Sequence, residues 1–137
     1  MAQTTTAGCI AALDAINALI GASGELRCYS GTIPANADAA ITGTLLSTHT
    51  LQNPAFGGAV DSGGNALATA TSSIGDDLTV IAGTPTHYRI LAGGTTTVWQ
   101  GTVSITAGAG ELKFDSVTWV DDGTATITGF TIQMTRT

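Results

Sequence analysis

Two cysteines and two histidines are the side chains of this sequence best suited to nucleophilic or metal chemistry. Cys9 and Cys28 lack the CxxC spacing of metal and redox sites. They could form one disulfide, but buried thiols are the better interpretation for a chain made in the cytoplasm. Cys9 lies on the predicted buried stripe of a helix, so we interpret it as a core residue rather than a nucleophile. His49 and His87 lie in separate strand candidates, where polar-face or satisfied histidines are more usual than zinc ligands.

Two pairs of neighbouring aspartates, Asp76-Asp77 and Asp121-Asp122, could hold calcium in loops. Their spacing matches no EF-hand, and aspartate beside glycine has a sufficient local role in a turn. The sequence also lacks the nucleophile elbow GxSxG, the metalloprotease motif HExxH and the phosphate-binding P-loop. We therefore predict no metal, no other cofactor and no enzymatic activity.

Trp99 and Trp119 lie on neighbouring strand candidates. Exposed together, they would form the aromatic face of a carbohydrate-binding module. Tryptophans are more often anchors of a core or an interface, so the carbohydrate-binding module remains an alternative to the interpretation developed below.

One helix is predicted, over residues 4–20. Thr5 or Thr6 can cap its start, and Gly21 can supply the left-handed residue that ends it. Its apolar residues recur at the helical period, which predicts one buried stripe, with Asp14 and Asn17 facing away from it. The stripe consists of Cys9, Leu13, Ile16 and Ile20.

Beyond Gly24 the sequence alternates with period two, as in a half-buried strand. Short strand candidates separated by Gly, Asn, Asp and Pro follow to the end, with tight hairpin turns expected at 91–95 and 121–123. We predict a single domain over 1–137 that is mainly β: an antiparallel β-sandwich or flattened barrel over 25–135 with the N-terminal amphipathic α-helix at 4–20. The strand candidates are 25–29, 43–51, 66–71, 78–81, 86–92, 96–105, 111–120 and 124–135.

Two of these candidates change face partway along. Leu112 and Phe114 have even numbers whereas Trp119 is odd, and a similar change occurs near Gly129. A change of face within a strand indicates a bulge or a crossing between sheets.

Few residues are charged. The 137 residues include only four Lys plus Arg, which are scattered, and the net charge is −6. Direct nucleic-acid binding and binding to anionic membranes are therefore not expected. No secretory leader is expected either, because no basic residue precedes residues 7–20. The sequence has 25 threonines instead, and a neutral surface of Thr, Ala and Gly is suited to being covered by neighbours in an assembly.

The stretch 25–57, "ELRCYSGTIPANADAAITGTLLSTHTLQNPAFG", resembles a set of small bacteriophage structural proteins. Their shared pattern is Y-S/T-G-x-x-P-A-x-x-D/N-x-A, then G-T-L-L, then P-A-F-G. Residues 86–91 and 98–104 are similar to a further pair of strands in that family, with His87-Tyr88 in place of Trp-Phe and Gln100 in place of Asp. Residues 124–134 resemble its C-terminal strand.

The resemblance implies a virion component made in the host cytoplasm, with no catalytic residues. The role we expect first is a capsid decoration or cement protein, whose partners are the major capsid protein and other copies of the chain. A tail or tail-fibre protein is the alternative. Candidate interface residues are Tyr29, Ile33, Pro34, Phe56, Trp99 and Trp119.

The stretch 29–38, "YSGTIPANAD", is predicted to be a connection without a reactive group. Gly31 permits a turn, and Pro34 ends strand pairing because it has no N–H to donate. Asn36 and Asp38 are expected to hold the return by side-chain bonds to the backbone. As an exposed loop, this stretch is also a candidate contact with a neighbouring protein.

Overall fold

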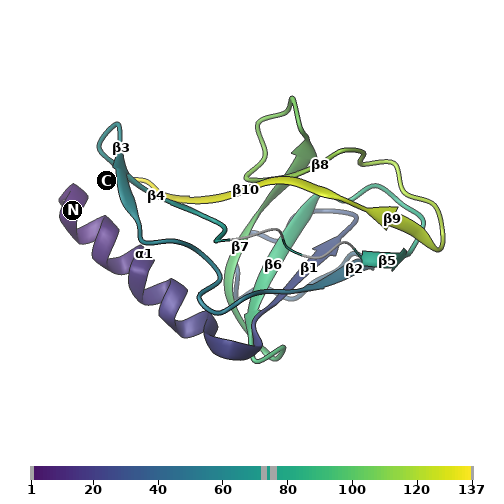
Figure 1. The fold of residues 1–137 in the computed structure, drawn as a ribbon, viewed down its shortest axis with the longest axis horizontal. Coiled ribbons are helices and arrows are strands. Elements are labelled where there is room, and N and C mark those ends of the chain that lie inside the picture. The colour runs from purple at the N-terminus through teal and green to yellow at the C-terminus, as the bar shows by residue number, and fades with distance from the viewer. Residues whose placement is uncertain (1, 72–73, 75–76, 137) are drawn as a thin grey trace.

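The computed structural model describes residues 2–71, 74 and 77–136 (Figure 1). One helix and a short 3-10 turn precede ten strands. The elements are α1 (Thr6–Ile20), η1 (Gly21–Ser23), β1 (Glu25–Tyr29), β2 (Leu45–Thr50), β3 (Val60–Ser62), β4 (Asn65–Thr69), β5 (Asp77–Val80), β6 (His87–Ala92), β7 (Thr96–Ile105), β8 (Leu112–Phe114), β9 (Gly123–Ala125) and β10 (Ile127–Met134).

The helix forms where the sequence predicts it. The Oγ1 atom of Thr5 accepts from the Gly8 N–H at 3.1 Å, a cap that contributes about 1 kcal/mol. Gly21 ends the helix with φ at +66°, a conformation that favours glycine. Cys9, Leu13 and Ile20 are buried, which confirms three members of the predicted stripe.

The apolar character of the helix extends to its outer side, where Leu19 is 63% exposed. Residues Thr6–Ser23, with a mean hydropathy of 1.4, have the length and composition of a membrane-crossing helix, a property shared by leader sequences and by core helices of soluble proteins. In the structure α1 packs against β4, β10 and β6.

Eight strands form one open sheet in the order β2-β1-β6-β7-β8-β10-β4-β3, and β5 pairs with β9 in a separate ribbon. The chain is 42% strand, which confirms a mainly β fold consistent with a sandwich or flattened barrel. Figure 1 shows β10 and β4 running across β6 and β7, so the sheet folds over itself. Its two halves face each other around the core.

One strand pair is parallel, a feature that the sequence did not predict. β8 runs alongside the end of β7, with Val103 opposite Leu112. The short connection doubles back, and its Gly110 N–H donates to Ser104 Oγ at 3.0 Å. A Cβ on Gly110 would lie 2.8 Å from the Ser104 nitrogen and the Val103 carbonyl carbon, so glycine is required there.

Aromatic rings join the two halves of the folded sheet. The Tyr88 ring on β6 meets the Phe130 ring on β10 edge to face, with centroids 5.1 Å apart. Phe56, in the segment that follows β2, also contacts Phe130, and their ring centroids are 5.0 Å apart. Both phenylalanines and Tyr88 are buried, and full burial of each side chain contributes about 1.5–3 kcal/mol.

The turns and the final strands confirm part of the prediction and correct the rest. Gly93 and Gly94, with φ at +59° and +68°, form the predicted hairpin between β6 and β7. The prediction of a hairpin at 121–123 is wrong, because β9 pairs with β5 and β8 pairs with β10. The candidate 111–120 contains only the three-residue strand β8, and the candidate 124–135 is divided between β9 and β10. β3 was missed.

Both predicted changes of face are real. The register of β10 against β8 shifts between Ile127 and Gly129. Phe114 lies in the eight-stranded sheet, whereas Trp119 bridges to Gly83 beyond β5. The two side chains meet edge to face at 4.9 Å, so the chain crosses from the sheet towards the ribbon between them.

Candidate functional site

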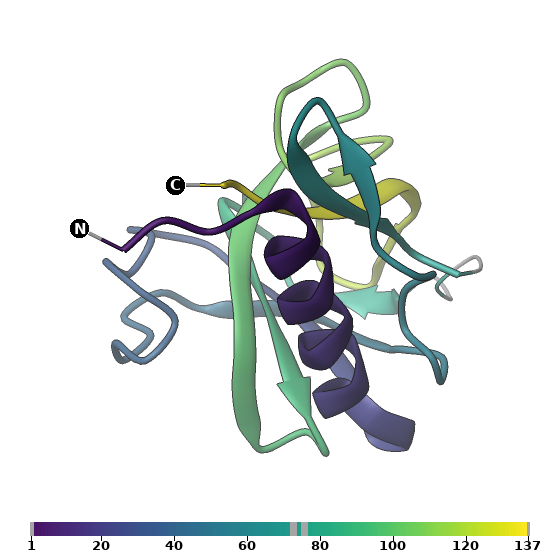
Figure 2. The same cartoon turned by 90° about the vertical axis from the view of Figure 1, so that its left-hand side faces the viewer.

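The connection between β1 and β2, residues 30–44, crosses the face of β1, β6 and β7 that lies opposite α1. We call it the 30–44 loop. Figure 2 shows it in blue on one side of the β6–β7 hairpin, with the helix on the other side. Its two ends are joined, because the Ser30 N–H donates to the Thr44 carbonyl at 3.0 Å. The loop therefore covers a sheet face that would otherwise meet water.

Arg89 on β6 and Gln100 on β7 hold the loop from below. Arg89 Nη2 donates to the carbonyls of Asn36, at 3.3 Å, and Ala39. Gln100 Nε2 donates to the Pro34 carbonyl at 2.9 Å, and its Oε1 accepts from Arg89 Nε at 3.0 Å. Arg89 is buried, and in the described part of the chain it forms no ion pair. Its charge is therefore stabilised by neutral oxygens, most of them from the loop.

Within the loop, Asn36 organises the carbonyls that Arg89 binds. Its Oδ1 accepts from the N–H groups of Asp38, at 3.0 Å, and Ala39, at 2.9 Å. This is the side-chain-to-backbone turn predicted for Asn36. For Asp38 the structure shows the reverse of the prediction, since its backbone donates and its side chain is exposed.

The loop closes through a tight backbone approach. Gly31 has φ at +86°, as its predicted turn requires. A Cβ on Gly43 would lie 1.7 Å from the Ser30 carbonyl oxygen, closer than any side chain permits. The glycines of the "YSG" and "ITGT" segments therefore make the closed loop possible.

Beneath the loop, the rings of Tyr29 and His87 stack with centroids 5.5 Å apart. Thr86 Oγ1 donates to the Gly31 carbonyl at 2.8 Å, and it lies 2.9 Å from His87 Nδ1. Which atom donates in the contact between Thr86 Oγ1 and His87 Nδ1 depends on the tautomer of the imidazole. Burial and the positive charge of Arg89 lower the pKa of His87 below its usual value of 6.5.

A second polar cluster lies on the core side of the same strands. Tyr88 Oη donates to Glu111 Oε2 at 2.6 Å, and Trp99 Nε1 lies 3.5 Å from the same oxygen. Burial and then the negative charge of Glu111 raise the pKa of Tyr88 well above its usual value of 10.0. A Cβ on Gly101 would lie 2.1 Å from Glu111 Oε2, so the cluster fills the space beside that glycine.

The six candidate interface residues do not form one surface. Tyr29, Phe56 and Trp119 are buried, so the prediction that they line an interface is wrong. Pro34 and Trp99 are half-buried, and Ile33 at 42% exposure is the member that projects from the loop. Buried aromatics that serve as core look the same in sequence as interface anchors.

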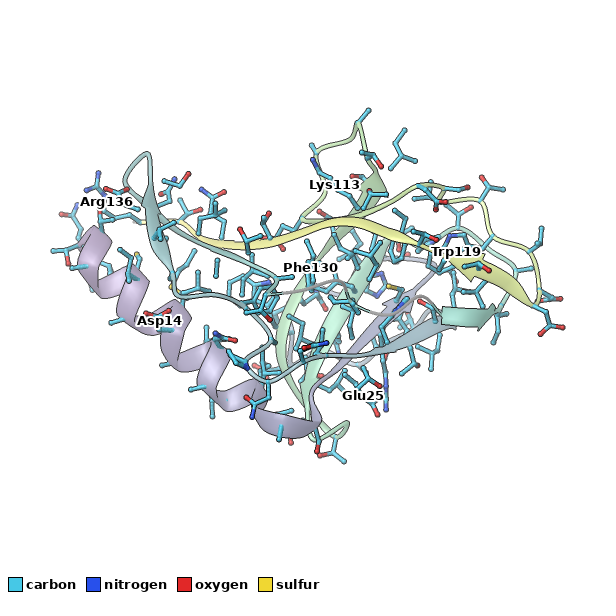
Figure 3. All side chains as sticks on the ribbon, in the orientation of Figure 1. Asp14, Glu25, Lys113, Trp119, Phe130 and Arg136 are labelled. Carbon is cyan, nitrogen blue, oxygen red and sulfur yellow. The ribbon has the colours of Figure 1, made fainter. Side chains whose placement is uncertain are left out.

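The two tryptophans do not share an exposed face. Trp119, labelled in Figure 3, is buried, and its Nε1 donates to the Ser116 carbonyl at 2.8 Å. Its ring packs edge to face on Phe114. Trp99 is turned towards Glu111. The paired aromatic platform that a carbohydrate-binding module would use is therefore not formed.

Cys9 and Cys28 are buried thiols, as predicted. His49 and His87 are also buried, so neither lies on a polar face; His49 Nε2 lies 3.2 Å from Ser47 Oγ, which fits the predicted satisfied histidine. They lie on opposite faces of the sheet, since His49 is opposite Leu26 and His87 is opposite Tyr29. The two rings therefore do not converge on one metal.

Asp121 has a structural contact, because its Oδ1 accepts from the Ala82 N–H at 2.8 Å. Asp122 occupies the turn with φ at +57°. The candidate pair Asp76-Asp77 falls partly outside the described residues. Among residues 2–71, 74 and 77–136 there is no group of three His, Cys, Asp or Glu side chains placed to hold a metal ion.

Sequence reasoning missed Arg89, Gln100 and Asn17. Arg89 is a charged residue within the apolar strand "HYRIL", a signal that could have indicated a buried cation with dedicated partners. Asn17, predicted to face away from the core, instead bonds the Phe56 backbone twice: Nδ2 donates to the carbonyl at 2.7 Å, and Oδ1 accepts from the N–H at 3.0 Å. It fastens α1 to the segment after β2.

The outer side of the 30–44 loop is almost uncharged. Asp38 is its one ionisable residue, and the remaining exposed positions are small or apolar: Gly31, Thr32, Ile33, Ala35, Asn36, Ala40, Thr42 and Thr44. Such a surface can bind a partner by shape, apolar contact and backbone hydrogen bonds. Comparisons of the chain with models of protein families, with curated proteins and with solved structures found no match.

Proposed function

We propose that the protein is a structural component of a bacteriophage virion, a decoration or cement protein that binds the outer capsid surface and stabilises it. The single observation that carries the proposal is the construction of the 30–44 loop. Side chains of β6 and β7 hold it in one shape, and its outward face is neutral with Ile33 exposed. Part of the resemblance to phage structural proteins, between Gly31 and Thr44, also falls on this loop.

A loop that is ordered before binding loses little conformational entropy when it docks. The contact of one loop is small, but many copies on a symmetric shell convert a modest contact into strong attachment. Association between copies would add to this effect, and we propose that the protein is an oligomer. The neutral threonine-rich surface supports both contacts, because few charges must be desolvated.

A binding assay with capsids of the phage that encodes the chain, assembled without this protein, tests the proposal. Wild-type protein should co-sediment with capsids at saturation. Ile33→Asp should bind at least about tenfold more weakly, because it places a charge in an apolar contact. Val60→Asp is the matched control: Val60 is 56% exposed on β3, and its variant should bind as the wild type does.

Wild-type protein that does not co-sediment with capsids overturns the capsid role. The alternative is a tail or tail-fibre protein, and co-sedimentation with purified tails alone would support it. If Ile33→Asp and Val60→Asp both bind normally, the 30–44 loop is not the contact surface.

A further inference from the structure

His87 is the one buried side chain whose polar atom is left without a partner in the described part of the chain. Its side chain has no exposed surface, and Nε2 makes no hydrogen bond there. Nδ1 lies 2.9 Å from Thr86 Oγ1, so it has a partner in either tautomer of the neutral ring. The imidazole lies beside Thr86, whose hydroxyl bonds the Gly31 carbonyl of the 30–44 loop, and the described residues offer no acceptor for a proton on Nε2.

We propose that His87 is a pH-sensitive latch: its neutral ring keeps the 30–44 loop closed, and its protonation releases the loop. The role of this release in attachment rests on the function proposed above, whereas the latch itself is a property of the fold. A protonated His87 carries an N–H on both ring nitrogens and a full positive charge, and its Nε2 N–H has no acceptor among the described residues. Opening of the loop would expose the Nε2 N–H and the positive charge to water.

The charged groups around His87 favour release of the loop when His87 is protonated. On β6, Arg89 is two residues along the same face, and on β1 the stacked partner is Tyr29. Further along β1, Arg27 is opposite Arg89 and is paired with Glu25 at 2.6 Å. On β7 the facing residues, Thr102 and Gln100, are uncharged.

The loop itself carries one carboxylate, on Asp38, which is exposed, and no ion pair joins it to His87 among the described residues. A protonated His87 would therefore lie beside the Arg89 cation without a compensating anion. Arg89 also holds the loop, so repulsion between the two cations acts on the same contacts that keep the loop closed.

The sign of the effect follows from linkage. His87 has a lower pKa with the loop closed than in water, so the closed state binds protons less well than the open state. The closed loop is fully favoured above about pH 6.5, which is the pKa of a histidine side chain in water. Below it, the population of the open loop rises about tenfold per pH unit until the closed-state pKa is reached.

Hydrogen exchange measured by mass spectrometry on the whole protein tests the latch. After correction for intrinsic exchange rates, protection of residues 32–42 should fall between pH 7.5 and pH 5, by at most about tenfold for each pH unit below 6.5. Protection of β6 and β7 should persist. His87→Phe keeps a ring to stack on Tyr29 and removes the titrating group, so its loop protection should not change with pH. His49→Gln, which alters the other buried histidine, should respond as the wild type does.

A second measurement does not depend on any variant folding. A nuclear magnetic resonance titration of the wild type should show the His87 ring and the loop amides changing with one midpoint below pH 6.5. Unchanged loop protection at pH 5, or a loop response retained in His87→Phe, overturns the latch. A loop that opens at pH 5 while capsid attachment at neutral pH is absent leaves the latch supported and contradicts the proposed function.

Discussion

Arg89 and Gln100, opposite each other on β6 and β7, are joined by an Nε–Oε1 hydrogen bond of 3.0 Å, and together they bind three carbonyls of the 30–44 loop. These bonds attach the 30–44 loop to β6 and β7. Neither side chain is held by an ion pair in the described residues, so the loop and its anchors depend on each other.

Arg89→Met should loosen the loop without dismantling the sheet. Methionine retains apolar volume but leaves the carbonyls of Asn36 and Ala39 without their donor, at a cost of about 1–3 kcal/mol. The variant should be cut faster within 30–44 by a protease that cleaves at aliphatic residues, and its urea midpoint should fall. Arg136→Met, at an exposed site, should match the wild type in both measurements.

Gly43→Ala should prevent the loop from closing. Its Cβ would lie 1.7 Å from the Ser30 carbonyl oxygen, which is a backbone atom, so relief of the clash requires the chain to move. We expect a loss of at least about 2 kcal/mol in the free energy of unfolding. Gly58→Ala is the matched control, because its Cβ would meet nothing within 4 Å. Equal stability of the two variants would contradict the close approach.

Asn17→Ala should detach α1 from the segment after β2. The substitution leaves the Phe56 N–H and carbonyl without partners, and Phe56 itself is buried against Phe130. Thermal or urea unfolding should show a loss of about 1–3 kcal/mol. The exposed Gln133→Ala should change stability by less than about 0.5 kcal/mol. A loss no larger than that of the control would show that the two bonds contribute nothing net.

Tyr88 should resist ionisation in alkaline solution. Its pKa is raised in the folded protein, so its contribution to stability is complete below about pH 10 and is lost as the pH rises beyond that value. Ultraviolet titration of a Tyr29→Phe variant isolates the Tyr88 signal. If Tyr88 ionises at the same pH in the native protein as in the denatured protein, its pKa is not raised by burial beside Glu111.

Much of the fold could be predicted because local patterns determine it. The helix has a cap at Thr5 and a left-handed glycine at its end, and β1 and β7 have the bounds that the alternation predicts. The change of face near Gly129 also appears as a register shift. These features depend on residues close together in the chain.

What the sequence could not provide depends on distant pairings. The parallel contact of β8 with β7 and the pairing of β9 with β5 join segments whose patterns fit several partners. Likewise, Trp119 and Phe56 are large apolar residues that could serve a core or an interface, and only packing places them in the core. The role of Arg89 in binding the loop could not be predicted without knowing which loop lies over β6.

The proposed function is tested most directly by the composition of purified virions. Under the proposed function, particles of a phage whose genome carries this sequence are separated on a gradient, and this protein is quantified by mass spectrometry against the major capsid protein. A decoration protein should keep a constant ratio to the major capsid protein across the particle peak, in intact virions and in isolated heads. Its absence from particles, or its presence on isolated tails but not on heads, would contradict the capsid role.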